Sequence, residues 1–402
     1  MAHTTTLDRP YAAAIDRPSL NPGPAAIALL AIGAAALFLN AAVNRRQALL
    51  FLVGAAAGVV LYHAAFGFTS SWRTFIVDRR GAGIRAQMLM LALTCLVFFP
   101  ALGSGHAFGQ TVRGSVSPVS ISVVIGAFLF GIGMQLGGGC ASGTLYSAGG
   151  GNTRMLAVLG AFIAGSVVGT AHMPWWVSLP AAKPISLITS FGTVVALAIS
   201  LAVFALLTLM TIVLERRRNG TLVDSSSRPA GWRRVLHGPW PLVAGAVGLA
   251  AVNIATLAIS GRPWGVTSAF ALWGAKALMA AGVNVAAWPY WSTPAQAASL
   301  KAGVIFDATS VMDVGIMLGA LVAAASAGRF APTWRVAPLS LVAAIAGGLL
   351  LGYGARIAYG CNIGAYFSGI ASGSLHGWLW LPAAFAGNAA GTRLRPLFGL
   401  RR

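Results

Sequence analysis

The chain has 402 residues, of which 57% are hydrophobic and only 8% are charged, and its mean hydropathy is +0.79. A soluble protein carries roughly a quarter charged residues, so this composition excludes a water-soluble globular fold and indicates a membrane protein. The 27 Lys and Arg residues outnumber the 7 Asp and Glu residues. Because the basic residues gather in short clusters between apolar stretches, we interpret them as anchors of cytoplasmic loops and expect no nucleic-acid partner.

The chain begins with a segment that we expect to be a tail, residues 1–24, followed by an apolar segment from Ala25 to Val43. This segment is long for the apolar region of a signal peptide, and the residues before it have no net positive charge. We therefore expect a first membrane span that is retained in the mature protein.

Nine stretches of the chain contain no Asp, Glu, Lys or Arg, and each is long enough for the ~20 residues that a crossing needs. They are 18–44, 47–72, 86–112, 114–153, 155–182, 184–214, 235–261, 336–355 and 357–392. The sequence therefore predicts an all-α polytopic membrane protein in which about nine helices cross the bilayer.

Five basic clusters separate these stretches, and we place all five in the cytoplasm by the positive-inside rule. They are Arg45-Arg46, Arg79 to Arg85, Arg216 to Arg234, Arg329 to Arg335, and Arg393 to Arg402. An even number of crossings must then separate the clusters, which predicts an odd total, a periplasmic N-terminus and a cytoplasmic C-terminus. The longest polar connection, 215–237, predicts a cytoplasmic linker between transmembrane halves at 25–214 and 238–392, with 393–402 as a basic tail.

Two motifs recur once in each half. Gly67-Phe68-Thr69-Ser70 matches Gly265-Val266-Thr267-Ser268, and the segment 131–143 matches 352–364 with Cys140 and Cys361 in register. Glycines in corresponding apolar segments of two halves indicate broken helices at the binding site of a transporter. We therefore expect four broken, re-entrant segments that meet near a pseudo-two-fold axis, with Gly139 and Gly360 directly before the two cysteines.

The charges near these motifs favour an anion as the ligand. No carboxylate falls inside the stretches that carry them, so we expect no buried acid for a proton relay or a cation site. The intramembrane charges are instead positive, Lys276 and Arg356, although Arg356 equally fits an anchor at the lipid headgroups. We expect no cofactor and no metal, because His63, His106, His172 and His376 show no ligand spacing.

The three cysteines have different expected roles. Cys95 lies in an ordinary apolar stretch, where a thiol packs as a small hydrophobic group. Cys140 and Cys361 lie in the repeated glycine breaks, where their S–H groups suit a soft, sulfur-bearing ligand without placing a charge in the membrane.

At these residues the chain resembles the YeeE/YedE family of bacterial inner-membrane proteins, whose characterised members take up thiosulfate. The resemblance implies an hourglass of transmembrane helices with four inward-dipping loops and thiols that pass the anion along by S–H···S contacts. It also implies that the loop cysteines of the family correspond to Cys140 and Cys361. This chain departs from the family at Thr69-Ser70-Ser71, where thiosulfate-transporting members have a further cysteine. The segments that carry the resemblance are 67–87, 128–151, 263–276 and 349–380.

The leading hypothesis is a transporter, and not an enzyme, that imports a thiosulfate-like anion through a path of cysteines in glycine-broken loops. The alternatives are uptake of a selenium compound or another reduced sulfur compound, a thiol redox relay in the membrane, and a scaffold for a cytoplasmic sulfur-carrier protein. The predicted path residues are Cys140, Cys361, Gly139, Gly360, Thr69, Ser70, Thr267, Ser268 and Arg356.

Overall fold

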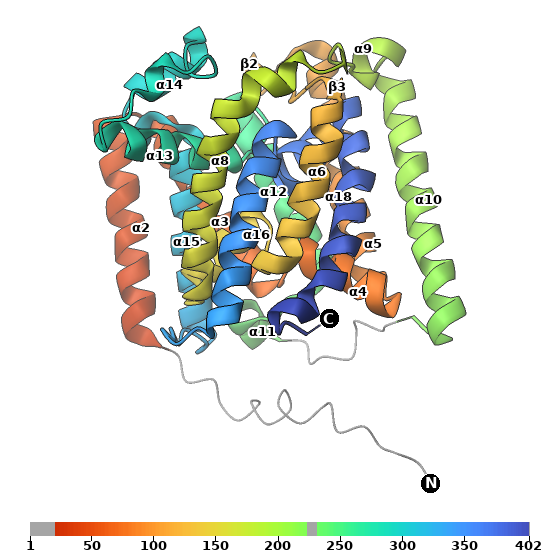
Figure 1. Cartoon of the computed structure of the whole chain (residues 1–402). Coiled ribbons are helices and arrows are strands. Elements are labelled where there is room, and N and C mark those ends of the chain that lie inside the picture. The colour runs from red at the N-terminus through yellow and green to blue at the C-terminus, as the bar shows by residue number, and fades with distance from the viewer. Residues whose placement is uncertain (1–20, 223–230, 402) are drawn as a thin grey trace.

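The computed structural model describes residues 21–222 and 231–401, which fold into a bundle of long helices (Figure 1). The first half contains α2 (Pro22–Ala42), α3 (Arg45–His63), α4 (Phe68–Asp78), α5 (Ala82–Ser104), β1 (His106–Ala107), β2 (Gln110–Thr111), β3 (Val119–Ser120), α6 (Ile121–Gly137), α7 (Ala141–Gly149), α8 (Arg154–Ser178), β4 (Ala181–Ala182), α9 (Leu187–Phe191) and α10 (Thr193–Asn219).

The second half follows the predicted linker, whose residues 223–230 lie outside the described part of the chain, as does most of the predicted N-terminal tail. It contains α11 (Trp232–His237), α12 (Leu242–Ser260), α13 (Thr267–Ala280), η2 (Val285–Ala287), α14 (Pro294–Lys301), η3 (Val304–Phe306), α15 (Ala308–Ser326), α16 (Pro338–Ile357), η4 (Asn362–Phe367), α17 (Ser368–Ala371), α18 (Leu375–Leu394) and η5 (Arg395–Phe398).

Within residues 21–222 and 231–401, nine helical segments are long and apolar enough to cross a membrane. The expected all-α polytopic fold with about nine spans is therefore confirmed. The four strands are two residues long and form two antiparallel pairs, β1 with β2 and β3 with β4. The division into two pseudo-symmetric halves and the re-entrant course of the loops stay predictions.

Polar caps and glycines set where the helices begin and end. The side chain of Asn44 accepts a hydrogen bond from the Gln47 amide at the start of α3, and Asp307 accepts one from the Ser310 amide at the start of α15. Such caps satisfy amides that have no partner within the helix. At the other end, α6 stops at Gly138, whose φ of +88° is a conformation that glycine adopts without strain.

Glycines spaced four residues apart bring the central helices into close contact. Gly54 of α3 lies against Met312 of α15, Gly58 lies against Ile316, and Gly319 lies against Ala55. Small residues at this spacing allow helix backbones to approach closely in membranes. Since the residue numbers rise together along the contact, α3 and α15 run in the same direction.

The repeated motifs predict that helices of one half have counterparts in the other. Following the register of the repeated motifs, α6 corresponds to α16, α8 to α18, and α3 to α12. In agreement with this register, α8 packs along α16 while α18 packs along α6, and α3 packs along α15 while α12 packs along α5. α6 and α16 also pack along each other and lie side by side in the middle of the view in Figure 1.

The described chain begins and ends at the same end of this bundle, in contrast to the predicted topology. Asn21 donates to the carbonyls of Ala325 and Phe330, so α2 begins beside the C-terminal end of α15. Thr153, at the start of α8, contacts the carbonyl of Thr333 from this same end, and Arg395 after α18 donates to Gln135 at the end of α6. The helix α18 is not among the nine apolar segments, but it packs along α6. Counted as a further pass, it makes the number of passes even, which returns the chain to the end at which it began.

The expectation that all five basic clusters lie on one side is also wrong. Because α3 runs parallel to α15, Arg45 and Arg46 at its start lie at the opposite end of the bundle from Arg329, which follows α15. Arg46 there donates to the carbonyl of Ser260, the last residue of α12. A charge pattern assigns a loop to a side only on average, and two arginines are too few to determine it.

Candidate functional site

The first cysteine lies where α6 ends and α7 begins. Cys140 is the residue that caps α7, and its Sγ accepts from the Gly143 amide at 3.4 Å and lies 3.4 Å from the Ser142 hydroxyl. Its carbonyl accepts from both the amide and the hydroxyl of Thr144 at 2.8 Å. The thiol is buried, so the break in the helix holds it inside the bundle.

The second cysteine has the same position after α16. Cys361 caps the π-helix η4, and its carbonyl accepts from the amides of Ala365 at 2.8 Å and Tyr366 at 3.3 Å. Gly360 has a φ of +148°, and a Cβ there would lie 2.7 Å from the Ala365 nitrogen. The backbone before Cys361 therefore requires glycine.

The two thiols share one buried region. Both are free and buried, they are close enough to interact electrostatically, and α7 contacts η4. Within the described residues, no three His, Cys, Asp or Glu side chains gather closely enough to hold a metal ion. The pair therefore offers two neutral, weakly donating S–H groups to a ligand.

The residues of the two Thr-Ser motifs separate into buried threonines and exposed serines. Thr69 and Thr267 are buried, and the Thr69 hydroxyl has no hydrogen-bond partner among the described residues. Ser70 donates to the carbonyl of Gly67, and Ser268 donates to Thr309. The structure therefore brings the threonines, and not the serines, to the interior.

A buried amide pair that the sequence analysis missed connects the first Thr-Ser motif to the end of α6. Gln135 donates to the carbonyl of Thr69 at 3.1 Å and also to the side chain of Asn388, which itself donates to Gly131. The repeated motif could have identified Gln135, because in the first copy it occupies the position that Arg356 occupies in the second. Both copies thus place a polar side chain five residues before the cysteine.

Arg356 does not lie against the thiols but points to the end of the bundle that holds α14. Its Nη1 donates to the Tyr290 hydroxyl at 2.9 Å, and its guanidinium lies 5.2 Å from the centre of the Tyr290 ring. Its Nε is buried without a partner among the residues described here. Lys276 has a structural role, because it donates to the carbonyls of Leu300 and Ala302.

Three arginines converge on the C-terminal end of α6, which carries the partial negative charge of the helix. Arg154 donates to the carbonyls of Leu136 and Gly137, Arg395 donates to that of Gln135, and Arg73 lies 3.5 Å from the Gln135 side chain. Burial, together with Arg73 and Arg154, lowers the pKa of Arg395, which follows α18, to about 10.

The expectation that the membrane holds no buried acid is wrong. Asp313, in α15, is fully buried, and within the described part of the chain neither of its carboxyl oxygens has a hydrogen-bond partner. Glu215 of α10 is equally buried, but it pairs with Arg85 at 2.7 Å and accepts from the Gly81 amide. Apolar sequence around Asp313 did not reveal whether its side chain faces lipid or protein, which depends on packing.

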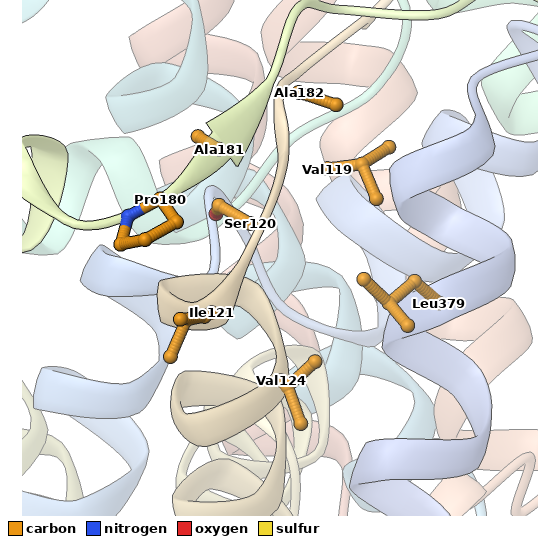
Figure 2. A pocket seen from close by; sticks show the side chains of 8 residues that line it. All are labelled: Val119, Ser120, Ile121, Val124, Pro180, Ala181, Ala182 and Leu379. Atoms are coloured by element: carbon orange, nitrogen blue, oxygen red, sulfur yellow. The ribbon is translucent and has the colours of Figure 1, made fainter.

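A surface pocket lies away from the thiols, where β3 and β4 pair beside α18 (Figure 2). The hydroxyl of Ser120, its polar side-chain group, already bonds to Ser122. The pocket therefore offers no free donor to an anion, and it contains none of the predicted path residues. Its lining is Val119, Ser120, Ile121, Val124, Pro180, Ala181, Ala182 and Leu379.

Known proteins are similar to this chain over most of its length. A family profile described as "Sulphur transport" matches residues 63–390. The chain belongs to this family. The thiosulfate transporter TsuA of Spirochaeta thermophila is 26% identical over 340 residues, which are 82% of this chain and 92% of TsuA. The probable transporter YedE is 34% identical in Salmonella typhimurium and 30% identical in Escherichia coli, over 142 and 161 residues.

The two YedE matches cover 35% and 40% of this chain and 34% and 39% of the YedE proteins, so they span little more than a third of either. The resemblance to the YeeE/YedE family is confirmed, and the protein is a multi-pass membrane transporter rather than an enzyme. All nine predicted path residues lie within the matched range, from Thr69 to Cys361.

Proposed function

We propose that this member of the sulphur transport family imports a thiosulfate-like dianion across the bacterial inner membrane, passing it between Cys140 and Cys361. The observation that carries the proposal is the pair of buried, free thiols in matching helix breaks, within electrostatic range of each other. A relative over most of this chain is a thiosulfate transporter, TsuA.

Neutral thiols suit the interior of such a path because burying them costs little compared with burying a charge. An S–H group is a weak donor and a polarizable one, so it contacts the terminal sulfur of thiosulfate without holding it tightly. Weak binding at two neighbouring sites allows the anion to move on instead of remaining bound.

Positive charge at both ends of the path favours an anion. Arg356 lies five residues before Cys361 at one end, and its Nε has no hydrogen-bond partner among the described residues. Arg73, Arg154 and Arg395 lie at the other end. Arginine forks match the oxygens of a sulfur oxyanion. The Thr69 hydroxyl, which has no hydrogen-bond partner in the described part of the chain, adds a donor at the loop where the family resemblance implies a cysteine.

The thiols are tested by replacing each with serine in purified protein reconstituted into liposomes. Serine at position 140 keeps an acceptor for the Gly143 amide, so the cap of α7 survives and only sulfur is lost. We expect Cys140→Ser and Cys361→Ser to fold and to lose thiosulfate uptake, while Cys95→Ala, buried in α5, keeps it.

Uptake is measured with labelled thiosulfate and with sulfate, selenite and cysteine as competitors. Normal uptake by either serine variant contradicts the thiol path, and competition by cysteine but not by unlabelled thiosulfate contradicts the anion. A disulfide between Cys140 and Cys361 that accumulates during turnover supports the redox relay instead. The sulfur-carrier partner stays a prediction, since the middle of the 215–237 segment lies outside the described residues.

A further inference from the structure

Asp313 is a buried acid that has no role in the anion path proposed above. It lies in the first third of α15, between Met312, which contacts Gly54 of α3, and Met317, which contacts Gly149 of α7. Its side chain is fully buried, and both carboxyl oxygens are without a hydrogen-bond partner in the part of the chain that the structure describes. A side chain of this kind inside a membrane protein indicates a functional site.

No charged or titratable group of the described residues forms an ion pair with Asp313. Its electrostatic neighbours are Asp307, at the start of the same helix, and the Cys361 thiol. Both ion pairs found between described residues involve Glu215, and neither involves Asp313. Among the elements packed against α15, α2 and η3 carry no titratable residue. The others carry Arg45, Arg46, Tyr62 and His63 in α3, Tyr146 in α7, Arg233, Arg234 and His237 in α11, and Lys276 in α13.

Two cations on helices packed against α15 already have hydrogen-bond partners elsewhere. Lys276 donates to two carbonyls of the α14 segment, and Arg46 donates to Ser260. A lone carboxylate in an apolar interior costs so much free energy that the group binds a proton instead. Asp313 is therefore a proton-binding group within electrostatic range of one of the two thiols that the anion visits.

The charge of the ligand supplies a reason for a proton there. The inside-negative membrane potential opposes entry of a dianion in proportion to its charge. An anion at Cys361 also favours the protonated form of a nearby carboxyl, since like charges repel. Each proton that enters with the dianion lowers the net negative charge that must cross.

We propose that Asp313 is the proton-coupling site of this transporter, so that the anion enters together with a proton held on its carboxyl. This inference rests on the proposed function. The carboxyl takes a proton from the solvent on the uptake side and releases it to the cytoplasm when the anion leaves. Asp307, half-buried at the end of the bundle that holds Arg46, is the group from which the proton reaches α15.

The test uses the full chain in liposomes with the membrane potential clamped at zero. For one proton per anion, an inside-alkaline gradient of one pH unit raises the equilibrium accumulation of thiosulfate about tenfold. Asp313→Asn has nearly the same shape but binds no proton. We expect it to keep thiosulfate exchange at equal pH and to lose the tenfold accumulation. Asp78→Asn, which removes an exposed acid at the end of α4, keeps both.

Each result decides between the two proposals. Gradient-driven accumulation by Asp313→Asn overturns the role of Asp313. Wild-type exchange of thiosulfate without any response to the gradient overturns proton coupling and leaves the proposed function intact, whereas wild-type protein that exchanges no thiosulfate overturns the proposed function and the coupling with it. If Asp313→Asn does not fold, proton uptake is followed with a pH-sensitive dye as thiosulfate is added to wild-type liposomes. No alkalinisation outside overturns the inference.

Discussion

At the residue scale, the two positions directly before the cysteines, Gly139 and Gly360, differ in how well they would accept a side chain. At Gly139 a Cβ would lie 3.2 Å from the Gly143 carbon and the Thr144 nitrogen, so a small shift makes room for it. At Gly360 a Cβ would lie 2.7 Å from a backbone nitrogen, and the φ of +148° disfavours any L side chain. Glycine is therefore more strongly required at position 360 than at the corresponding position 139.

The difference predicts the ranking of two alanine variants. We expect Gly360→Ala to lower the stability of the protein in detergent by about 1–3 kcal/mol, because both the backbone conformation and its neighbours oppose a methyl group. Gly139→Ala costs less. Thermal unfolding measures both, with Gly364→Ala as the control, since a Cβ there meets nothing within 4 Å. Equal melting temperatures for Gly360→Ala and Gly364→Ala contradict the argument.

At the element scale, the position of Asp313 depends on how tightly α15 packs on α3. Gly54 and Gly58 on α3 lie against the backbone of α15, and Gly315 and Gly319 on α15 lie against the backbone of α3. A Cβ at Gly319 would lie 1.9 Å from the Ala55 carbonyl oxygen. The neighbouring atoms are backbone and cannot rotate away. The two helices must therefore separate to admit any side chain.

We expect Gly319→Ala to destabilise the protein by about 1–3 kcal/mol and to reduce transport, because separation of α3 and α15 displaces the buried face of α15. Gly160→Ala in α8, where a Cβ meets no atom within 4 Å, keeps the melting temperature and the activity. Melting temperature and uptake are compared for the two variants. A Gly319→Ala protein as stable as Gly160→Ala shows that the helices are not in close contact.

At the scale of the whole molecule, the basic residues are distributed unequally between the two ends of the bundle. The end at which α15 and α18 finish holds the arginines that follow these helices, together with Arg154 and the arginines of α10 and α11. From the positive-inside rule we expect this end, at which Asn21 also lies, to face the cytoplasm. α2 and α10 lie at the two edges of the bundle with most of their surface open to lipid (Figure 1).

This arrangement predicts which side of the membrane each end of α2 faces. Single cysteines at Gly23, Ala42 and Leu397, in a chain whose own cysteines are buried, are treated with a membrane-impermeant maleimide. We expect Ala42→Cys to react in intact cells, and Gly23→Cys and Leu397→Cys to react only after permeabilisation. Labelling of Gly23→Cys and Leu397→Cys from opposite sides contradicts the packing of Asn21 against Ala325.

The amino-acid sequence by itself determined the features that depend on composition and on local backbone chemistry. Charge-free stretches predicted the spans other than α15, which contains Asp313, because the membrane core excludes charge over a fixed thickness. The repeated glycine–cysteine motif predicted the two helix breaks, because glycine before a capping residue is a local requirement. The family followed from the same residues, among them Cys140 and Cys361.

Only the tertiary structure decided the features that depend on which distant segments meet. The two Thr-Ser motifs predicted four polar side chains in the path, but packing buries Thr69 and Thr267 and leaves Ser70 and Ser268 exposed. Asp313 is surrounded by apolar residues in the sequence, and its burial comes from the packing of α15 against α3 and α7. The side occupied by Arg45 and Arg46 likewise follows from helix directions, because each added or missing pass reverses every loop after it.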